Sequence, residues 1–351
     1  MSIKNFSTAI NEALDEALRH DSNVICYGLG VTDPKAVFGT TANLLSQYGP
    51  ERVFDMPTSE NAMTGVAIGA ALNGIKSVMV HQRIDFFLLA MDQLINGAAK
   101  WHYMFGSQTA VPITIRLIIG RGWGQGPTHS QNLQAWFAHI PGLKVVMPTT
   151  PEDAKGLLLS SIFDPNPVVF LEHRWLHNVS GEVPEGDFRL PLGKARVARE
   201  GKDVTIVSMS YMTLEALQAA EYLEQHGISV EVVDLRTIKP LDWETVFDSV
   251  EKTGRLLALD TGLTTGSVAG EVVARVAIEK FKALKVAPAR LAMPDVPEPT
   301  SFALTKGFYV RASDIATKVL LMMGRQALNV KQDLPEPTPH DVPGSWFKGP
   351  F

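Results

Sequence analysis

The sequence predicts an α/β protein with two doubly wound domains. Short apolar runs rich in β-branched residues alternate with stretches in which apolar residues recur at helical spacing, which is typical of a mainly parallel sheet covered by helices. The alternation occurs twice, and residues 179–200, which are polar and rich in glycine and proline, separate the two series as a linker. The length of 351 residues also exceeds that of one typical domain.

The first series predicts a domain over residues 1–178. Phe6, Ile10 and Leu14 show the helical period, whereas residues 111–119 are rich in β-branched side chains, as expected of a buried strand. A glycine-rich loop follows that strand at residues 120–131. The helices expected in this domain span residues 6–19, 61–73, 86–103, 132–140 and 151–163, and the strands span 23–30, 52–56, 76–81, 111–119, 143–148 and 167–172.

The second series predicts another domain over residues 201–328. Two of its helical patterns end in a glycine, Gly227 and Gly254, which is the usual signal for the end of a helix. The helices expected here span residues 212–227, 242–254 and 267–284, and the strands span 203–210, 229–236 and 255–260. Residues 329–351 are rich in proline and glycine, so we expect them to form an extended tail.

Composition excludes several classes of protein. The net charge of -5 argues against a nucleic-acid or anionic-membrane partner. The only cysteine is Cys26, so no internal disulfide can form, which fits a reducing compartment. The amphipathic first 20 residues lack the apolar core of a signal peptide, and no apolar run approaches the ~20 residues that span a bilayer. We therefore expect a cytoplasmic protein.

Glu60 opens the helix expected at 61–73, directly after a Pro-Thr-Ser turn. Such an acid favours the positive N-terminal end of a helix, with Ser59 or Thr58 as the N-cap, and this alone would explain it. The helix also contains Gly65 and Gly69, each of which costs about 0.5–1 kcal/mol relative to alanine. A cofactor ring or a neighbouring subunit that packs closely against the helix would offset that cost.

Five segments of the chain together carry a family resemblance. They read RVFDMPTSENAMTGVAIGAALNG, LAMDQLINGAAKWHYM, THSQNLQAWFAHIPGLKVVMPTTPEDAKGLL, DPNPVVFLE and VEVVDLRTIKPLD. In this order they resemble the beta subunit of the thiamine-diphosphate-dependent 2-oxo acid dehydrogenase first component, of the pyruvate and branched-chain type, within the transketolase-like superfamily. The resemblance implies a transketolase-like pyrimidine-binding domain at 1–178 and a transketolase C-terminal-like domain at 201–328. It also implies decarboxylation of a 2-oxo acid and transfer of the acyl group.

The resemblance implies three cofactor-binding residues for thiamine diphosphate. Glu60 matches the acid that contacts N1′ of the aminopyrimidine, where a carboxyl group in an apolar setting can share a proton with the ring. Thr58 matches the position whose main-chain carbonyl accepts a hydrogen bond from the 4′-amino group. Ile84 stands where the family usually has an aromatic residue, so it can pack on the ring, but stacking is lost.

The resemblance also implies that His129 is a catalytic residue that steers the substrate and the acyl transfer. An imidazole exchanges protons near pH 7, although a histidine here could instead cap the next helix. Arg83 and Arg121 are candidate substrate residues, because paired guanidinium hydrogen bonds suit a carboxylate or a phosphate. The polar stretch at residues 81–85, His-Gln-Arg-Ile-Asp, is unusual for the family and indicates either an ion-paired strand end or an altered substrate pocket.

A potassium site is a further implication of the resemblance. Oxygen-only ligation suits a hard cation, although a plain turn would explain the same residues. The ligands implied are the side chains or carbonyls of Ile113, Ser161, Ile162, Asp164 and Asn166.

The chain lacks the Gly-Asp-Gly motif that anchors Mg²⁺ and the diphosphate in relatives. A separate alpha subunit must then supply that half of the site. The family arrangement is an alpha2-beta2 heterotetramer, with a lipoyl acyltransferase core as a possible further partner.

Two other functions remain open at this stage. A transketolase-like subunit would keep the cofactor and transfer a two-carbon unit to a sugar or another acceptor. A non-catalytic assembly subunit would have no use for both Glu60 and His129.

Overall fold

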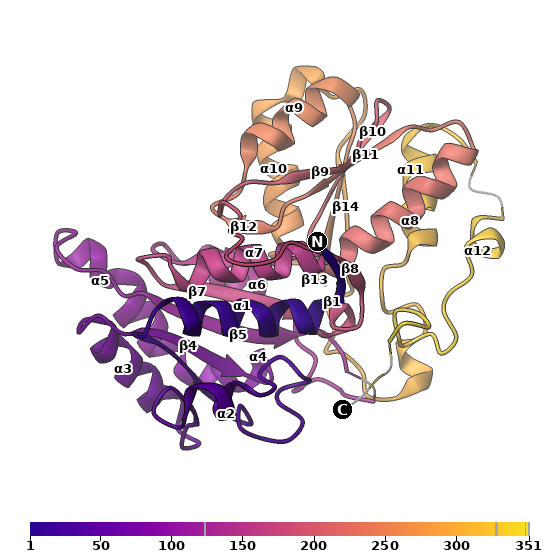
Figure 1. The fold of residues 1–351 in the computed structure, drawn as a ribbon. Coiled ribbons are helices and arrows are strands. Elements are labelled where there is room, and N and C mark those ends of the chain that lie inside the picture. The colour runs from indigo at the N-terminus through magenta and orange to yellow at the C-terminus, as the bar shows by residue number, and fades with distance from the viewer. Residues whose placement is uncertain (123, 327–328, 348, 350–351) are drawn as a thin grey trace. The chain divides into compact units, whose positions relative to one another are not determined.

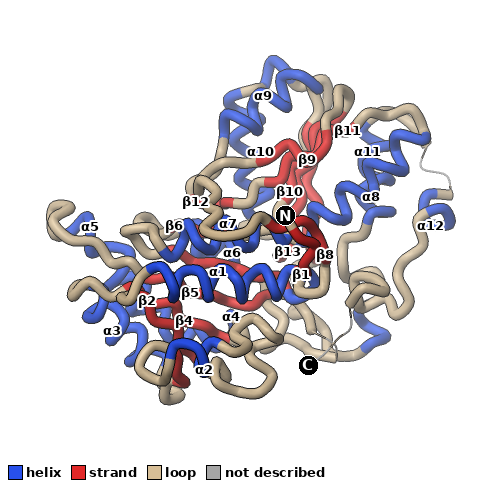
Figure 2. The backbone as a smooth tube through the Cα atoms, in the orientation of Figure 1, coloured by secondary structure: helices blue, strands red, loops and turns tan. Residues whose placement is uncertain are grey.

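A computed structural model describes residues 1–122, 124–326, 329–347 and 349 of the chain. They form two compact units (Figure 1). Of the described residues, unit 1 comprises 1–122, 128–192, 347 and 349, and unit 2 comprises 124–127, 193–326 and 329–346. Each unit has helices packed on a mainly parallel sheet (Figure 2), so the predicted fold class is confirmed. No helix among the described residues is long and apolar enough to span a membrane.

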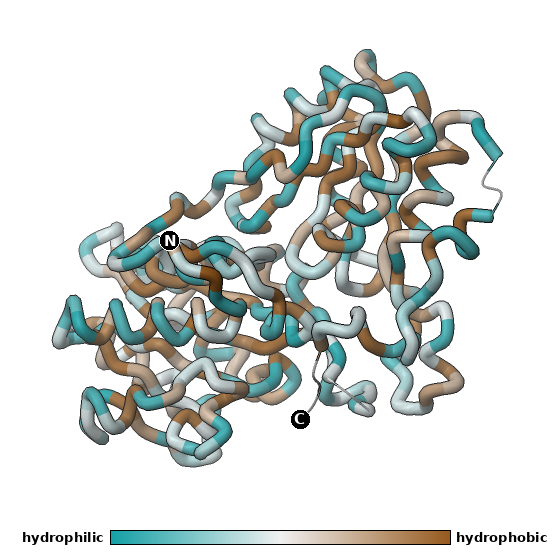
Figure 3. Tube along the Cα trace, turned by 45° about the vertical axis from the view of Figure 1, so that its right-hand side comes forward, coloured by the Kyte–Doolittle hydropathy of each residue, from teal (hydrophilic) through white to brown (hydrophobic). Residues whose placement is uncertain are grey.

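The sheet of unit 1 has the strand order β6-β7-β5-β4-β2-β3, and each of these neighbouring strands pairs with the next in parallel. All the residues of its central strand β5 are buried, which matches their apolar and β-branched character. Figure 3 colours the Cα trace by hydropathy, and brown hydrophobic stretches run through the middle of each unit. The strands are β2 (Val24–Gly28), β3 (Val53–Asp55), β4 (Lys76–His81), β5 (Ile113–Ile119), β6 (Lys144–Val146) and β7 (Val168–His173).

The helices of unit 1 cover both faces of this sheet. Two of them, α1 and α7, pack against each other on one face, and α3 lies on the other (Figure 1). The helices are α1 (Phe6–His20), α2 (Leu44–Tyr48), α3 (Glu60–Ala71), α4 (Ile84–Phe87), α5 (Ala99–Met104), α6 (Gln134–His139) and α7 (Pro151–Ile162). A short antiparallel pair, β1 (Ser2–Asn5) with β8 (Ser180–Val183), completes the unit.

The long helix expected at 86–103 is irregular in the structure. After α4 the chain continues as a 3₁₀ turn at Leu88–Ala90, a π-helical segment at Gln93–Ala98 and then α5. The π-helical segment contains Gly97, where an added Cβ would lie 2.9 Å from the Ile68 side chain of α3. Gly97 therefore allows α3 to approach this helix closely.

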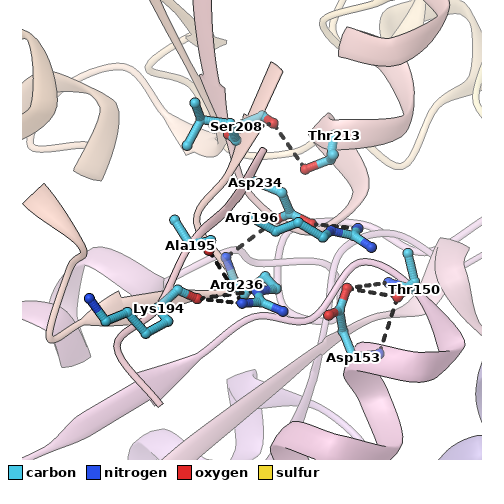
Figure 4. A network of polar contacts seen from close by, with 10 residues as sticks. Thr150, Asp153, Lys194, Ala195, Arg196, Ser208, Thr213, Asp234 and Arg236 are labelled. Carbon is cyan, nitrogen blue, oxygen red and sulfur yellow. Dashed lines mark hydrogen bonds and ion pairs between the residues drawn. The ribbon is translucent and has the colours of Figure 1, made fainter. Parts of the chain in front are cut away.

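Local hydrogen bonds explain where the two packed helices of unit 1 begin. At α1, the Asn5 side chain accepts a hydrogen bond from the backbone of Thr8. At α7, Thr150 and Asp153 form a reciprocal capping box ahead of Pro151 (Figure 4). These local hydrogen bonds fix the first residue of α1 and the first residue of α7 without tertiary contacts.

The sheet of unit 2 has the strand order β14-β13-β10-β11-β9 and is parallel except at β9. Helices α9 and α10 lie on one face, and α8 with α11 lies on the other (Figure 1). The strands of this sheet are β9 (Arg196–Arg199), β10 (Val204–Ser208), β11 (Val230–Asp234), β13 (Leu256–Leu263) and β14 (Ala289–Met293). A short strand β12 (Thr237–Lys239) belongs to unit 2 but not to this sheet. The helices are α8 (Tyr211–Gln225), α9 (Trp243–Thr253), α10 (Val268–Glu279), α11 (Ala312–Met322) and α12 (Val330–Asp333).

A polar network fixes the start of unit 2 to its sheet (Figure 4). Arg236, in the left-handed region with a φ of 54°, donates from Nε and Nη2 to the carbonyl of Lys194 at 3.1 and 2.9 Å. Asp234 accepts from the Arg196 side chain at 3.3 Å. Residues 179–200, expected as a linker, thus contain β8 and β9 and these hydrogen bonds.

Candidate functional site

Glu60 is a buried acid at the first position of α3. Its side chain is 5% exposed, and Ser59, the N-cap, makes no side-chain capping bond. Among the described residues, none donates a hydrogen bond to the Glu60 carboxylate or forms an ion pair with it. A helix-terminal role accounts for the position but not for the burial, because a buried carboxylate without a partner is costly. The carboxylate is therefore available to a group that this chain does not supply.

The turn before Glu60 lies at the carboxyl end of the sheet. The backbone N–H of Met56 donates to the carbonyl of Gly28 at 2.8 Å, which joins the ends of β3 and β2. An added Cβ at Gly28 would lie 2.0 Å from the Val80 carbonyl oxygen of β4, so only glycine fits there. Thr58, in the same turn, is exposed.

The two glycines of α3 have different surroundings. An added Cβ at Gly65 would lie 3.3 Å from the side-chain oxygen of Gln93, so Gly65 is packed inside the chain. Gly69 has nothing within 4 Å. It lies on an exposed face of α3 with Ala62 and Val66, whose side chain is 58% exposed. Contacts within unit 1 therefore do not account for Gly69.

The structure brings Arg83, Ile84 and His129 together around α4. Ile84 is fully buried at the first position of that helix. His129 is exposed, and its ring meets the ring of Phe86 edge-on, with centroids 5.3 Å apart. Gln131 donates to the Asp85 carboxylate at 2.7 Å, which holds the loop at 128–131 against the helix. His129 does not cap α6, whose N-cap is Leu133.

Arg83 and Arg121 follow neighbouring strands, β4 and β5. Both are almost fully buried, with exposures of 3% and 1%. Arg83 donates from Nη1 to the carbonyl of Gly120 at 2.6 Å. Because Gly120 directly precedes Arg121, this hydrogen bond holds the Arg83 side chain beside the backbone of Arg121. This arrangement concentrates positive charge at the carboxyl edge of the sheet, as a substrate carboxylate or phosphate would require.

His81, at the end of β4, is neutral at physiological pH. Burial lowers the pKa of its imidazole to about 4. Neither ring nitrogen has a hydrogen-bond partner among the described residues, and the ring packs edge-on against Phe87 at 4.9 Å. His81 therefore behaves as an apolar side chain in this sheet.

A buried ion pair inside the same sheet did not appear among the sequence-based candidates. Arg116 of β5 donates to both carboxylate oxygens of Glu172 of β7, at 2.6 and 3.0 Å, and both side chains are fully buried. Burial alone would raise the pKa of Glu172, but the charge of Arg116 and the nearby His177 lower it to about 2. A charged residue within the apolar run 113–119 was the signal for this pair.

The residues predicted to bind potassium lie at the opposite edge of the sheet from Glu60. Ile113 begins β5, and Asp164 and Asn166 precede β7, so they belong to the amino ends of the strands. The Asp164 carboxylate pairs with Lys144 and accepts from the Asn166 backbone at 2.9 Å. Among the described residues no cluster of His, Cys, Asp or Glu could hold a metal, and the carbonyl-based potassium site stays a prediction.

The two buried glutamates of unit 1 should respond oppositely to neutralisation. Glu172→Gln is expected to lower the free energy of unfolding by about 3–5 kcal/mol, because it leaves the buried Arg116 unpaired. Glu60→Gln should leave stability unchanged or raise it, because no partner is lost. Urea denaturation of both variants tests this. A loss for Glu60→Gln as large as that for Glu172→Gln would reveal a partner inside the chain.

Buried histidine should make stability depend on pH. The unfolded chain binds a proton on His81 near pH 6.5, and the folded chain binds it only near pH 4. The unfolded state thus holds more protons between these values, and stability falls as pH falls from about 6.5 to 4. The wild type should lose about 3 kcal/mol of unfolding free energy through His81 over that pH range, and the His81→Leu variant should not lose it. Denaturation midpoints at pH 7 and pH 4.5 test this, with the exposed His226→Gln as a control that keeps the wild-type dependence.

Two known domain families match the chain: the transketolase pyrimidine binding domain over residues 4–178, and the transketolase C-terminal domain over residues 193–315. Solved structures share the fold. A split-gene transketolase beta4 tetramer described as inactive has a TM-score of 0.73 at 24% identity, with 91% of this chain and 98% of that chain covered. Transketolase from Campylobacter jejuni has a TM-score of 0.67 at 14% identity, covering 91% of this chain and 47% of that one.

Named relatives are more similar in sequence. Acetoin:2,6-dichlorophenolindophenol oxidoreductase subunit beta of Cupriavidus necator is 43% identical, with 88% of this chain and 94% of the relative covered. The 2-oxoisovalerate dehydrogenase subunit beta of Bacillus subtilis is 42% identical, with 90% and 97% covered. The mitochondrial pyruvate dehydrogenase E1 component subunit beta-2 of Oryza sativa is 43% identical, with 88% and 83% covered. These matches confirm the resemblance: the chain belongs to the thiamine-diphosphate-dependent family of E1 beta subunits of 2-oxo acid and acetoin dehydrogenases.

Proposed function

We propose that this chain is the beta subunit of an enzyme that decarboxylates a 2-oxo acid and transfers the acyl group. The observation that carries the proposal is the buried Glu60 carboxylate, which has no partner among the described residues. A family member that had become an assembly subunit would gain stability by losing such a group. Its retention favours a catalytic subunit.

Residues at the start of α3 and α4 fit the pyrimidine half of thiamine diphosphate. When bound, the cofactor supplies a thiazolium carbon that adds to the keto carbon of the substrate. Glu60 would hold a proton at the pyrimidine N1′, and the Thr58 carbonyl would accept from the 4′-amino group. Ile84 keeps the ring contact that the family resemblance implies, but the chain itself covers its side chain, so a neighbouring side chain would have to move for the ring to reach it. Burial strengthens the Glu60 contact, because little water reaches a side chain that is 5% exposed.

His129 is suited to exchange protons with the substrate. Its ring is exposed on the loop at 128–131, where it contacts the Phe86 ring edge-on and its Nδ1 lies 3.1 Å from Thr128 Oγ1. An accessible imidazole on an anchored loop can reach a substrate bound over α4.

A partner chain is needed to complete this site. The sequence lacks the motif that would anchor Mg²⁺ and the diphosphate, so we assign those ligands to an alpha subunit within an alpha2-beta2 heterotetramer. The names of the relatives describe them as beta subunits of multi-subunit enzymes. The exposed small face of α3, with Ala62, Val66 and Gly69, favours close packing by another chain. A lipoyl acyltransferase as acyl acceptor and a structural potassium ion belong to the same proposal.

The catalytic assignment is tested in the purified complex with the alpha subunit. Glu60→Gln should lower kcat by about 10²–10⁴, the usual contribution of a proton-transfer group, without changing assembly. The readout is thiamine-dependent release of carbon dioxide from a panel of 2-oxo acids. Glu244→Gln is the matched control, because Glu244 is also an acid in the first turn of a helix but is 78% exposed. Wild-type turnover by the Glu60 variant would overturn the assignment.

The exposed face of α3 gives a separate test of the partner. Gly69→Ala should stabilise the isolated chain by about 0.5–1 kcal/mol, because space is free there and glycine disfavours a helix. Gly69→Trp should fold normally but fail to assemble with other chains. Analytical ultracentrifugation of the mixed subunits measures this, with Thr8→Trp on the exposed side of α1 as control. Normal assembly of the Gly69→Trp variant would place the interface elsewhere.

A further inference from the structure

Arg174 is a buried cation for which no described residue serves as an acceptor. It directly follows β7, in a 3₁₀ turn at Arg174–Leu176, and is 4% exposed. Its guanidinium carbon lies 4.2 Å from the ring centre of Phe38 and 5.2 Å from that of Phe347. Its Nε is buried with no hydrogen-bond partner, and no described residue accepts a hydrogen bond from the guanidinium or forms an ion pair with it.

Other buried arginines of the chain have the carboxylate acceptor that Arg174 lacks among the described residues. Arg116 has both oxygens of Glu172, and Arg311 of unit 2 donates to Glu215 at 3.2 Å. The aromatic rings beside Arg174 attract a cation, but that attraction is weaker than the cost of removing a guanidinium from water. They do fix the plane of the guanidinium, so its N–H groups are oriented before any ligand arrives.

A second positive charge lies nearby. Arg83 and Arg174 follow β4 and β7, the two strands that flank β5, at the same edge of the sheet. Burial and then the charge of Arg83 lower the pKa of Arg174 to about 10. Arg83 is itself 3% exposed. Two like charges held together in a buried place favour an anion between or beside them.

We propose that Arg174, with Arg83 beside it, binds an oxyanion, either a carboxylate or a phosphate group. Arg83 and Arg174 follow β4 and β7 at the carboxyl edge of the parallel sheet, where open α/β sheets bind their ligands. The planar fork of Arg174 suits two parallel hydrogen bonds to such a group. Ile84, adjacent to Arg83, is a proposed cofactor contact, so the anion would lie beside the catalytic site.

The substrate is the first candidate source of the oxyanion. This part of the inference rests on the proposed function, and it names the substrate class: a 2-oxo acid with a second acidic group, or a phosphorylated acceptor. A small free anion is the second source, with the same chemistry.

Binding to the full-length chain tests the site itself, independently of any turnover. Inorganic phosphate and succinate are titrated calorimetrically at constant ionic strength. The wild type should bind at one site, and Arg174→Met should bind at least tenfold more weakly. Arg174→Lys keeps the charge without the planar fork and should fall between them, and it decides the matter if the methionine variant fails to fold. Absence of wild-type binding, or equal binding by the variants, overturns the proposal.

Arg189→Met is the matched control for this titration. Arg189 also lies over a phenylalanine ring, that of Phe163 at 3.9 Å, but it is paired with Asp187. Its replacement should leave anion binding unchanged. A tenfold loss in this variant would show that any arginine on an aromatic ring has the same effect, and would overturn the assignment to Arg174.

Kinetics of the complex with the alpha subunit identify the source of the anion. For a substrate-borne group, Arg174→Met should lower the ratio of kcat/KM for a 2-oxo acid with a distal carboxylate, or for a ketose phosphate, to that for an uncharged 2-oxo acid by at least tenfold. An unchanged ratio with retained anion binding assigns the site to a free anion. If the complex turns over no substrate while the chain still binds phosphate or succinate, the proposed function fails and the anion site stands.

Discussion

Parallel pairing in the sheet of unit 1 is the constraint on which the rest of the site depends. Because its strands run in one direction, the segments that follow β3, β4, β5 and β7 all emerge at one edge. Those segments carry Glu60, α4, Arg121 and Arg174. Residues separated by more than 100 positions in sequence thus share one edge, while the predicted potassium ligands lie at the other edge. A slip in the pairing of β4 with β5 would move Arg83 away from Gly120.

The buried charged side chains of this sheet are of two kinds, those in an ion pair and those outside one. Arg116 and Glu172 are fully buried and form an ion pair through Nε and Nη2 of the guanidinium, so they join β5 to β7 at a defined register. Buried ion pairs contribute more to specificity of packing than to net stability, and this pair occurs where a register shift would expose both charges. Glu60 and Arg174 have no such partners in the part of the chain that the structure describes. The same sheet therefore contains one satisfied pair and two isolated charges, and only the isolated charges call for a ligand.

Much of the fold could be predicted from the sequence, and the part that could not has physical reasons. The strand 113–119 was evident because a β-branched apolar run of that length is typical of a buried parallel strand. The irregular helix run at 84–104 was not, because the apolar spacing of 86–103 is that of a regular helix, and the close approach of Ile68 to Gly97 in the π-helical segment is a tertiary contact. Residues 179–200 appeared to be a linker from their composition, yet β8 and β9 pair with strands distant in sequence. Long-range pairing leaves little trace in composition.

Some residues of the candidate site could likewise be named from the sequence, and others could not. Glu60, Ile84 and His129 lie in segments that the family resemblance covers, so they could be named from the sequence. Arg174 could not, because a single arginine after a strand gives no sign of whether an acid will meet it. Its significance comes from burial, from the rings of Phe38 and Phe347 and from the absence of an acceptor in the described part of the chain.

Glu60 and Arg174 have opposite charges, yet the fold prevents them from neutralising each other. They follow β3 and β7, which are four strand spacings apart in the order β7-β5-β4-β2-β3, or about 19 Å at the strands. A sheet that needed only stability would pair such charges or replace them with apolar residues. This sheet holds the Glu60 carboxylate and the Arg174 guanidinium apart at one edge, each buried and each without a partner among the described residues. That separation is what a site needs in order to hold a cofactor near one charge and the acidic end of another molecule near the other.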